Sequence, residues 1–279
     1  MRYIIDIVSR IKEARSELSR AILAPRKWPQ VPRLAVRRFV RGDHPLVGRW
    51  RRRRGGRVDL AGCVFDLDVP QVSDGIFSRF VLGRYEKPEI MAVGEHLPRD
   101  LPLLELGAGL GVVSCIANKH LEHPEQHWVI EANPELLDVI EKQRALNAAG
   151  FSVLHGALSY EDPAKIYINR ARVTATSAQR TRGELVEVPA VTLSDLVQRY
   201  GITECSMMID IEGAELDLVE REGDILARYV EFFIMEVHPD VYGEAGVDKL
   251  RERCKRLGFS VRAYVPPVLV MQRSASNTN

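Results

Sequence analysis

From residue 101 onward, short apolar segments alternate with segments whose apolar residues recur every three or four positions. The first kind has the length of buried strands, and the second has the periodicity of amphipathic helices. This alternation predicts an α/β fold, with a doubly wound, mostly parallel, seven-stranded sheet that helices cover on both faces. The expected strands are 101–106, 127–131, 153–157, 207–211, 230–237, 259–264 and 268–271, the last two forming an antiparallel edge. The expected helices are 112–120, 134–148, 193–200, 214–222 and 247–257.

The remaining segments are assigned by the same patterns. Residues 3–23 carry an apolar stripe at helical spacing, 58–69 have the pattern of a short hairpin, and 74–97 that of a helix. Residues 163–191 are polar with alternating β-branched positions, which predicts an inserted hairpin or lid. The expected division is a basic amphipathic extension (1–60), a helical lead-in (61–100), a sheet domain (101–273) and a disordered tail (274–279).

Charge is distributed unevenly along the chain. Residues 1–57 contain 17 lysines and arginines against four carboxylates, a net charge of +13, while the rest of the chain carries −12. Either this arm packs as a helix with a solvated basic loop, or it binds an anionic surface such as lipid headgroups. Nucleic acid is the weaker option because few aromatic residues accompany the arginines. With neither a signal peptide nor a membrane span evident, we expect a cytoplasmic protein, or one peripheral to the inner face of a membrane.

Cysteine and histidine spacing gives no sign of a structural metal site. None of the four cysteines forms a CxxC pair, so neither zinc binding nor a disulfide framework is indicated. His120, His123 and His127 cluster near the first predicted helix, and we expect them to be solvated loop residues.

The strongest chemical signal is the sequence ELGAGLG at residues 105–111, between a predicted strand and a predicted helix. Gly107, Gly109 and Gly111 allow a sharp turn and a close approach of ligand to the backbone. A dinucleotide site needs GxGxxG, and here the third glycine comes one residue early. Glu105 would repel a pyrophosphate but suits a ligand with an ammonium and a sulfonium group, such as S-adenosylmethionine.

The ends of the next two predicted strands supply further ligand contacts. Glu131 ends its strand 20 residues past the last glycine, where a carboxylate can accept two hydrogen bonds from a ribose diol. Asn133 follows as a candidate helix cap. The third strand leads into Gly156, Ala157 and Leu158, whose backbone and small side chains could border an adenine.

Acidic residues and an imidazole follow the fourth and fifth strands. Asp210 and Glu212 alternate along the chain and so point to one side, and Gly213 permits the turn into the next helix. Glu236 and His238 occupy the same place after the following strand. Because ligands of open α/β sheets bind at the carboxyl ends of the strands, these groups should converge beside the ligand. By contrast, Glu215 is expected on a helix face.

These motifs together resemble the FkbM family of methyltransferases. The resemblance covers residues 83–272 and rests on GRYE (83–86), ELGAGLG (105–111), VTLSDL (191–196), IDIEGAE (209–215) and EVH (236–238). The chain departs from the family pattern at Met208, where a lysine is usual, and at Ser194, where an aspartate is common.

The resemblance implies a Rossmann-like class I methyltransferase that uses S-adenosylmethionine for O-methylation in glycan or natural-product biosynthesis. The expected acceptor is a hydroxyl of a sugar, a glycolipid, a lipid-linked saccharide or a related small molecule. The expected catalytic residues are Asp210, Glu212, Glu236 and His238, with Asp210 or His238 as the base. The expected cofactor-binding residues are Glu86, Glu105, Gly107, Ala108, Gly109, Gly111, Glu131, Ala132, Asn133, Gly156, Ala157, Leu158 and Asp210.

Three alternatives stay open. One alternative is a divalent metal bound by Asp210 and Glu236, since oxygen ligands suit magnesium. We expect instead that the site works without a metal ion. A non-catalytic, regulatory protein with this fold would leave Asp210, Glu212, Glu236 and His238 without a role. A nicotinamide-dependent reductase fits the fold but not the glycine spacing. The oligomeric state is not predicted.

Overall fold

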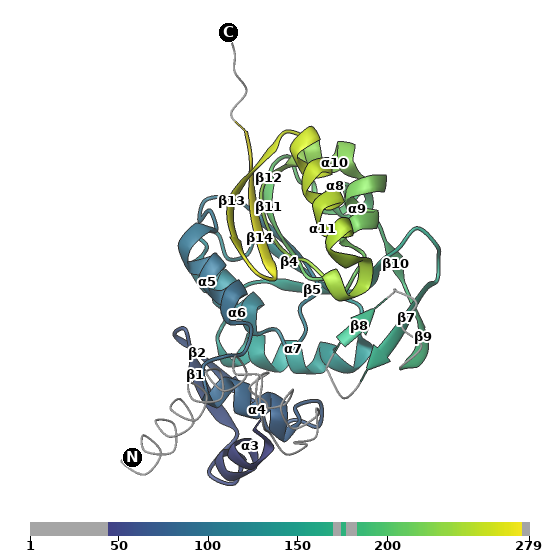
Figure 1. Cartoon of the computed structure of the whole chain (residues 1–279). Helices are drawn as coiled ribbons and strands as arrows, with labels where there is room; N and C mark the ends of the chain where they lie inside the picture. The colour runs from purple at the N-terminus through teal and green to yellow at the C-terminus, as the bar shows by residue number, and fades with distance from the viewer. Residues whose placement is uncertain (1–43, 170–173, 177–182, 275–279) are drawn as a thin grey trace, which may run out of the picture.

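The computed structural model describes residues 44–169, 174–176 and 183–274. A seven-stranded sheet forms its centre (Figure 1). β14 is antiparallel to both its neighbours and the other neighbouring pairs are parallel. The spatial order is β5 (Ser152–His155), β4 (His127–Glu131), β3 (Leu103–Leu106), β11 (Cys205–Ile209), β12 (Val230–Glu236), β14 (Val268–Arg273) and β13 (Phe259–Val265). This order confirms the predicted fold. From β3 the chain adds strands toward one edge of the sheet (β4, β5) and then, starting with β11, toward the other edge, so the strand order reverses between β3 and β11.

Helices cover both faces of this sheet (Figure 1). One face packs against α4 (Asp74–Val81), α5 (Lys87–His96), α6 (Val112–His120) and α7 (Pro134–Leu146). The other face packs against α8 (Leu193–Tyr200), α9 (Glu215–Arg221), α10 (Gly223–Tyr229) and α11 (Pro239–Arg256). Successive strand residues alternate between these two cores: Leu103 lies in the first and Leu104 in the second. Strands buried on both faces explain the continuous apolar segments in the sequence.

Outside the sheet, the hairpin prediction for 58–69 is confirmed by β1 (Arg57–Leu60) and β2 (Cys63–Asp66), which pair antiparallel. The helix expected over 74–97 is two helices, α4 and α5. Ser73 caps the first by accepting a hydrogen bond from the backbone of Ile76. Both helices pack into the core on one face of the sheet, so the lead-in is part of the same hydrophobic core.

The segment expected as an inserted hairpin forms one small sheet and shares a second with β6, which precedes it. β7 (Ala164–Asn169) pairs antiparallel with β8 (Thr174–Thr176) and with β9 (Glu184–Val188). β6 (Ala157–Leu158) and β10 (Ala190–Val191) pair in parallel where the segment leaves and rejoins the fold. This insertion follows β5, at the end of the sheet opposite β13 (Figure 1).

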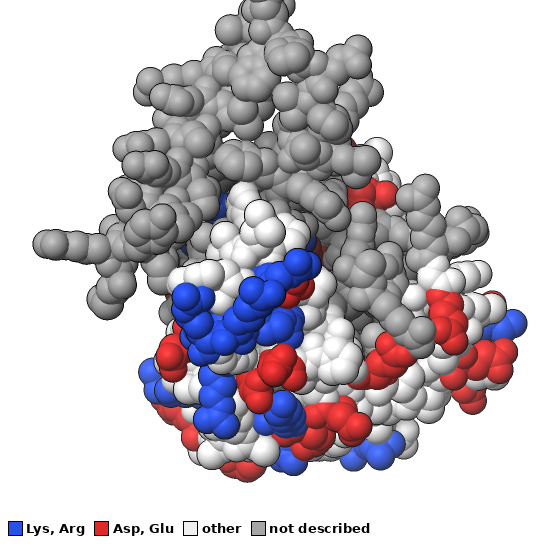
Figure 2. Space-filling model, turned by 90° about the horizontal axis from the view of Figure 1, so that it is seen from below, with Lys and Arg blue, Asp and Glu red and all other residues white. Residues whose placement is uncertain are grey.

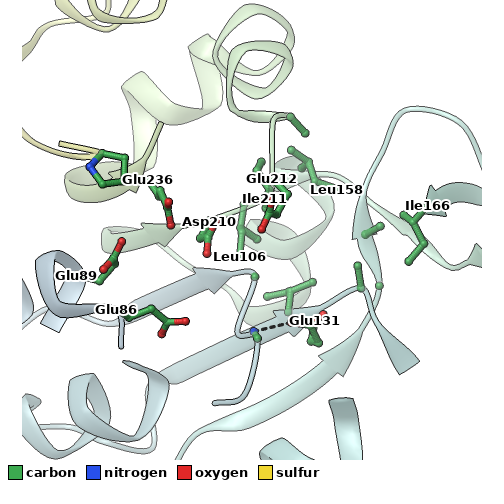
Figure 3. A pocket seen from close by; sticks show the side chains of 18 of the residues that line it. Glu86, Glu89, Leu106, Glu131, Leu158, Ile166, Asp210, Ile211, Glu212 and Glu236 are labelled. Carbon is green, nitrogen blue, oxygen red and sulfur yellow. Dashed lines mark hydrogen bonds between the residues drawn. The ribbon is translucent and has the colours of Figure 1, made fainter. Parts of the chain in front are cut away.

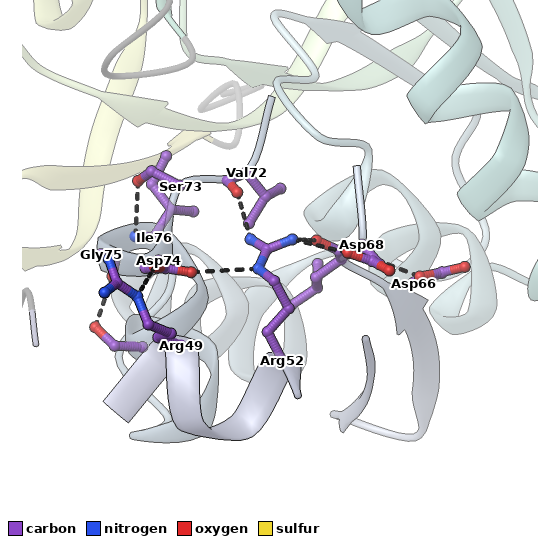
Figure 4. A network of polar contacts seen from close by, with 11 residues as sticks. Arg49, Arg52, Asp66, Asp68, Val72, Ser73, Asp74, Gly75 and Ile76 are labelled. Carbon is purple, nitrogen blue, oxygen red and sulfur yellow. Dashed lines mark hydrogen bonds and ion pairs between the residues drawn. The ribbon is translucent and has the colours of Figure 1, made fainter. Parts of the chain in front are cut away.

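The described part of the basic extension begins with α3 (Pro45–Arg52), which packs on α4. The guanidinium of Arg52 binds the carboxylates of Asp68 and Asp74 and the carbonyl oxygens of Leu67 and Val72 (Figure 4). The Arg52 side chain is only 24% exposed, so this arginine fits the packing interpretation. The amphipathic helix expected over 3–23 and most of the tail lie outside the described residues. Among the described helices, none is both long and apolar enough to cross a membrane.

Candidate functional site

A cavity of about 340 Å³ opens at the carboxyl ends of β3, β4, β11 and β12 (Figure 3). It lies where the strand order changes direction, the usual ligand site of open α/β sheets, and its volume suits a small molecule. The sequence-predicted residues that line it are Glu86, Gly107, Gly109, Glu131, Ala132, Gly156, Ala157, Leu158, Asp210, Glu212 and Glu236. The structure therefore brings most of the predicted cofactor and catalytic positions together.

The glycine turn after β3 is held between its two neighbouring strands. The amide of Gly107 donates to the carbonyl of Ile130 at 2.9 Å, and the amide of Asp210 donates to the carbonyl of Leu106 at 2.8 Å. Gly107 has φ +86°, and a Cβ there would lie 1.8 Å from the carbonyl oxygen of Asp210. Only glycine can occupy this position, because the turn passes directly against the end of β11.

Glu131 shapes the same turn. Its Oε2 accepts hydrogen bonds from the amides of Ala108 and Gly109, both at 2.9 Å, and its Oε1 accepts from the amide of Asn133 at 2.7 Å. Burial raises the pKa of this carboxyl group against the opposing effect of these three amides. A carboxylate can accept about four hydrogen bonds, and three of those of Glu131 are taken by backbone amides. About one is left for a ribose hydroxyl, whereas the sequence suggested that Glu131 accepts two hydrogen bonds from the ribose.

Glu105 is placed differently from the expectation that it contacts a cationic cofactor. Its Oε1 accepts a hydrogen bond from Ser114 Oγ at 2.8 Å, and its Oε2 lies 2.9 Å from Nε2 of His127. Glu105 is 1% exposed and borders only a smaller adjoining cavity. Its carboxyl group is therefore held in the core beneath the turn and does not line the main cavity.

The expectation for the three histidines is wrong at two of them. His127 begins β4 and is fully buried, because its ring pairs with Glu105. His120 is half-buried and its Nε2 is within hydrogen-bond distance of the Leu97 carbonyl, at 2.9 Å. His123 is exposed as expected.

Besides Glu105, four predicted residues lie outside the main cavity. Ala108 lines the smaller adjoining cavity. Gly111 and Asn133 are the N-caps of α6 and α7, and the Asn133 side chain accepts a hydrogen bond from the amide of Glu135. These two residues support the walls of the cavity. His238, the fourth, stands behind Asp210 and is 6% exposed.

His238 is surrounded by three carboxylates from the segment that follows β11. Its Nε2 lies 3.5 Å from Asp210 Oδ1 and 3.8 Å from Glu212 Oε2, and its Nδ1 lies 3.0 Å from Glu215 Oε1. Although burial lowers the pKa of this imidazole, Glu215, Asp210 and Glu212 together raise the pKa of His238 to about 10. The ring is therefore an imidazolium at neutral pH, which makes His238 an ineffective proton acceptor.

Asp210 has the protonation behaviour of a general base. Its side chain is 40% exposed and lines the cavity. Withdrawal from bulk solvent and the charge of Glu212 raise the pKa of Asp210 to about 8, although His238 opposes the change. A base is most effective when its pKa lies near the working pH, so Asp210 is better suited than His238 to remove a proton.

Two further carboxyl groups complete the acidic side of the cavity (Figure 3). Glu89, at the start of α5, lines the same cavity as Glu236, and burial raises the pKa of Glu89. Burial, Asp210 and Glu89 raise the pKa of Glu236 to about 10, and burial raises the pKa of Glu86 well above its ordinary value. Sequence reasoning missed Glu89, whose signal was its spacing of three residues from Glu86. It also missed the lining residues Arg79 and Tyr85.

One set of described residues has donor atoms close enough together for a metal ion: Asp210, Glu215 and His238, within 4.8 Å of one another. The two carboxylates face opposite nitrogens of the imidazole ring, however, and a single ion can bind only one of those nitrogens. The arrangement therefore fits an imidazolium between two carboxylates better than a metal centre.

The strand order, the glycine turn and the acidic residue that ends β4 define a Rossmann-like class I methyltransferase. The model of the FkbM methyltransferase domain matches residues 105–261, which is more than half of the chain. The chain therefore belongs to the FkbM family of methyltransferases.

Solved structures resemble the chain at low sequence identity. One is precorrin-6y C5,15-methyltransferase from Geobacter metallireducens (12% identity, 69% of this chain and 89% of that chain, TM-score 0.44). Another is a protein of the NADB-Rossmann superfamily from Streptococcus agalactiae (12%, 68% and 70%, TM-score 0.42). A third is Aeropyrum pernix fibrillarin with bound S-adenosyl-L-methionine (10%, 66% and 72%, TM-score 0.39). No curated protein matches the chain.

Proposed function

We propose that the chain is an S-adenosylmethionine-dependent O-methyltransferase. Its acceptor is a hydroxyl of a sugar, a glycolipid, a lipid-linked saccharide or a related natural product. The main support for this proposal is that Asp210 lines the same cavity as the glycine turn and that its carboxyl group has a pKa of about 8. A hydroxyl must lose its proton during methyl transfer, so a base beside the cofactor site suits it.

The charges of the cavity support S-adenosylmethionine as the cofactor. The lining carboxyl groups of Glu86, Glu89 and Glu131 complement a ligand with an ammonium and a sulfonium, because a bound cation favours their ionised form. In this assignment the glycine turn and Glu131 hold the ribose, while Ala157 and Leu158 border the adenine. When bound, the cofactor supplies a methyl group attached to a positively charged sulfur.

The protein's own residues then align and deprotonate the acceptor. Asp210 accepts the hydroxyl proton, and the imidazolium of His238, 3.5 Å from its Oδ1, stabilises the ionised carboxylate. Glu212 and Glu236 accept hydrogen bonds from neighbouring hydroxyls, which orients a polyhydroxylated acceptor. These roles follow the expected catalytic set, with Asp210 chosen over His238 as the base.

Labelled methyl transfer tests this proposal. The purified protein is incubated with methyl-labelled S-adenosylmethionine and a panel of neutral glycosides, lipid-linked sugars and primary amines. We expect label on a hydroxyl oxygen of a saccharide, located by mass spectrometry and NMR. Transfer only to a nitrogen or carbon atom, or to none of a broad saccharide panel, would contradict O-methylation.

A lipid-linked acceptor would require access to a membrane, and the α3 surface supports this second part of the proposal. Leu46 and Trp50, one helical turn apart, are 79% and 37% exposed. Arg54 stacks over the Trp50 ring at 4.0 Å, and Arg49 is 62% exposed. Figure 2, which faces α3 and α4, shows basic side chains gathered beside acidic ones. Exposed apolar and aromatic residues flanked by arginines suit an anionic lipid surface.

Liposome flotation tests this contact. We expect the full chain to float with vesicles that contain anionic lipid, and not with neutral vesicles. The double substitution Leu46→Ser and Trp50→Ser should weaken flotation, whereas Leu185→Ser, at an exposed position in β9, should not. Equal flotation of both variants would show that α3 is not the membrane contact.

A further inference from the structure

Glu215 occupies an unexpected position for a residue of the first turn of a surface helix. It is fully buried, although the sequence suggested a helix face. Its Oε1 accepts hydrogen bonds from the amides of Gly213 at 3.1 Å and Ile211 at 3.3 Å, and the same atom lies 3.0 Å from Nδ1 of His238. One carboxylate oxygen therefore binds both the turn after β11 and the imidazole that follows β12.

The turn that Glu215 binds has an unfavourable backbone conformation. Glu212 has φ +53° and Gly213 has φ +112°. A Cβ at Gly213 would lie 2.8 Å from Cγ1 of Val241. The left-handed region is unfavourable for a non-glycine residue, so surrounding contacts must stabilise it. The hydrogen bonds that Glu215 accepts from the amides of this turn are such contacts. They hold Glu212 in the wall of the cavity.

His238 is also held at its backbone amide and at its other ring nitrogen. Tyr242 Oη accepts a hydrogen bond from the His238 amide at 2.7 Å, which fixes the backbone. On the other ring nitrogen, Nε2 faces Asp210 and Glu212. A carboxylate on Nδ1 fixes the orientation of the ring, so Glu215 holds Nε2 toward Asp210 and Glu212.

We propose that Glu215 is a positioning residue for methyl transfer, which holds the protonated ring of His238 against Asp210 and holds the turn that carries Glu212. This inference rests on the proposed function, in which Asp210 is the base. Glu215 does not line the cavity, so its effect reaches the acceptor only through these neighbours.

Glu215→Gln tests the proposal because the amide keeps the shape and one acceptor oxygen but removes the charge. We expect kcat to fall about 10- to 100-fold, the range seen when an orienting partner of a functional histidine is removed. The KM for S-adenosylmethionine should change less than about threefold, because the cofactor site is untouched. Glu220→Gln is the control: it lies on the same helix but pairs with Lys249 on the surface.

The pH dependence separates positioning from simple structural damage. The groups facing His238 are Asp210, Glu212 and Glu215, together with Tyr242 and, from α5 and β12, Glu89 and Glu236. Loss of the Glu215 charge lowers the pKa of His238 from about 10. The high-pH decline of kcat should therefore move to lower pH in Glu215→Gln, and NMR titration of the imidazole should show the same shift.

The NMR titration needs no turnover, so it can fail independently of the proposed function. A lower His238 pKa together with a lower kcat supports the proposal. An unchanged His238 pKa, or an unchanged kcat despite a lower pKa, overturns it. If Glu215→Gln does not fold, Glu215→Asp gives a second test, since it keeps the charge at a greater distance. We expect it to retain a His238 pKa above 7 and measurable turnover, and a neutral ring at pH 7 would contradict the proposal.

Discussion

Oδ1 of Asp210 and Nε2 of His238 are 3.5 Å apart, and this contact joins the carboxyl ends of the adjacent strands β11 and β12. The two residues are 28 positions apart in the sequence, and only the parallel pairing of their strands brings them together. The pair places a protonated ring behind a carboxylate that faces the cavity. The catalytic predictions below follow from this division of roles.

Asp210→Asn removes the proposed base and keeps the size of the side chain. We expect kcat to fall by about 10²- to 10⁴-fold, the usual contribution of a general base. Binding of S-adenosylmethionine should stay within a few-fold of wild type, measured by calorimetry. Asp217→Asn, at an exposed position of α9, should leave both quantities unchanged. Turnover of Asp210→Asn within a few-fold of wild type would show that another group is the base.

Gly107→Ala tests the packing of the glycine turn against β11. A Cβ at this position would overlap the Asp210 carbonyl, so either the turn or the strand end must move. We expect a lower free energy of unfolding, by more than about 1 kcal/mol, and at least tenfold weaker cofactor binding. The matched control is Gly94→Ala in α5, where a Cβ meets open space. That helical substitution should raise the stability by about 0.5–1 kcal/mol.

Binding of a cationic cofactor should release protons from the acidic cavity. Glu236 has a pKa of about 10, so it is protonated at pH 7 without ligand, and burial raises the pKa of Glu86 well above its ordinary value. A nearby cation favours the ionised form and lowers these pKa values. The affinity should therefore increase as the pH rises from 6 to 9. Calorimetry in buffers with different ionisation heats measures the protons released.

The matched ligand for that experiment is S-adenosylhomocysteine, which lacks the sulfonium charge. It should release fewer protons than S-adenosylmethionine. Equal apparent enthalpies for S-adenosylmethionine in all buffers would contradict the protonated state of the acidic cavity.

Glu105→Ala should destabilise the fold without a direct loss of ligand contacts. The substitution leaves the buried ring of His127 and the buried hydroxyl of Ser114 without their carboxylate partner. A buried polar group that is left without its partner costs about 1–3 kcal/mol, which urea unfolding can measure. Glu125→Ala, at an exposed position before β4, should change the stability by less than about 0.5 kcal/mol. A similarly small change in Glu105→Ala would contradict the structural role of the carboxylate.

The sequence predicted best those elements whose ends carry local signals. The bounds of α8 match the expectation, and Thr192 and Asp195 form a capping box at its start. The bounds of α6 and β4 match as well. By contrast, α11 begins at Pro239, eight residues before the expected start, and Gly243 interrupts its helical backbone. That interruption weakens the apolar periodicity on which the prediction relied.

Predictions for the site succeeded where chain direction alone determines position. Asp210, Glu212 and Glu236 follow parallel strands, so their meeting at one edge could be inferred from the strand pattern. The pairing of Glu105 with His127 could not, because it depends on the lateral register of β3 and β4. The burial of Glu215 could not be predicted either. It depends on the left-handed backbone conformation of Glu212, which is unusual for a residue other than glycine.

Titration of the purified chain with S-adenosylmethionine, with NADH as a parallel control, tests most directly whether this cavity is a methyl-donor site. The account predicts saturable, one-to-one binding of S-adenosylmethionine in the micromolar range and no binding of NADH. Binding of NADH alone, or of neither ligand, would contradict the assignment of the glycine turn and Glu131 to S-adenosylmethionine.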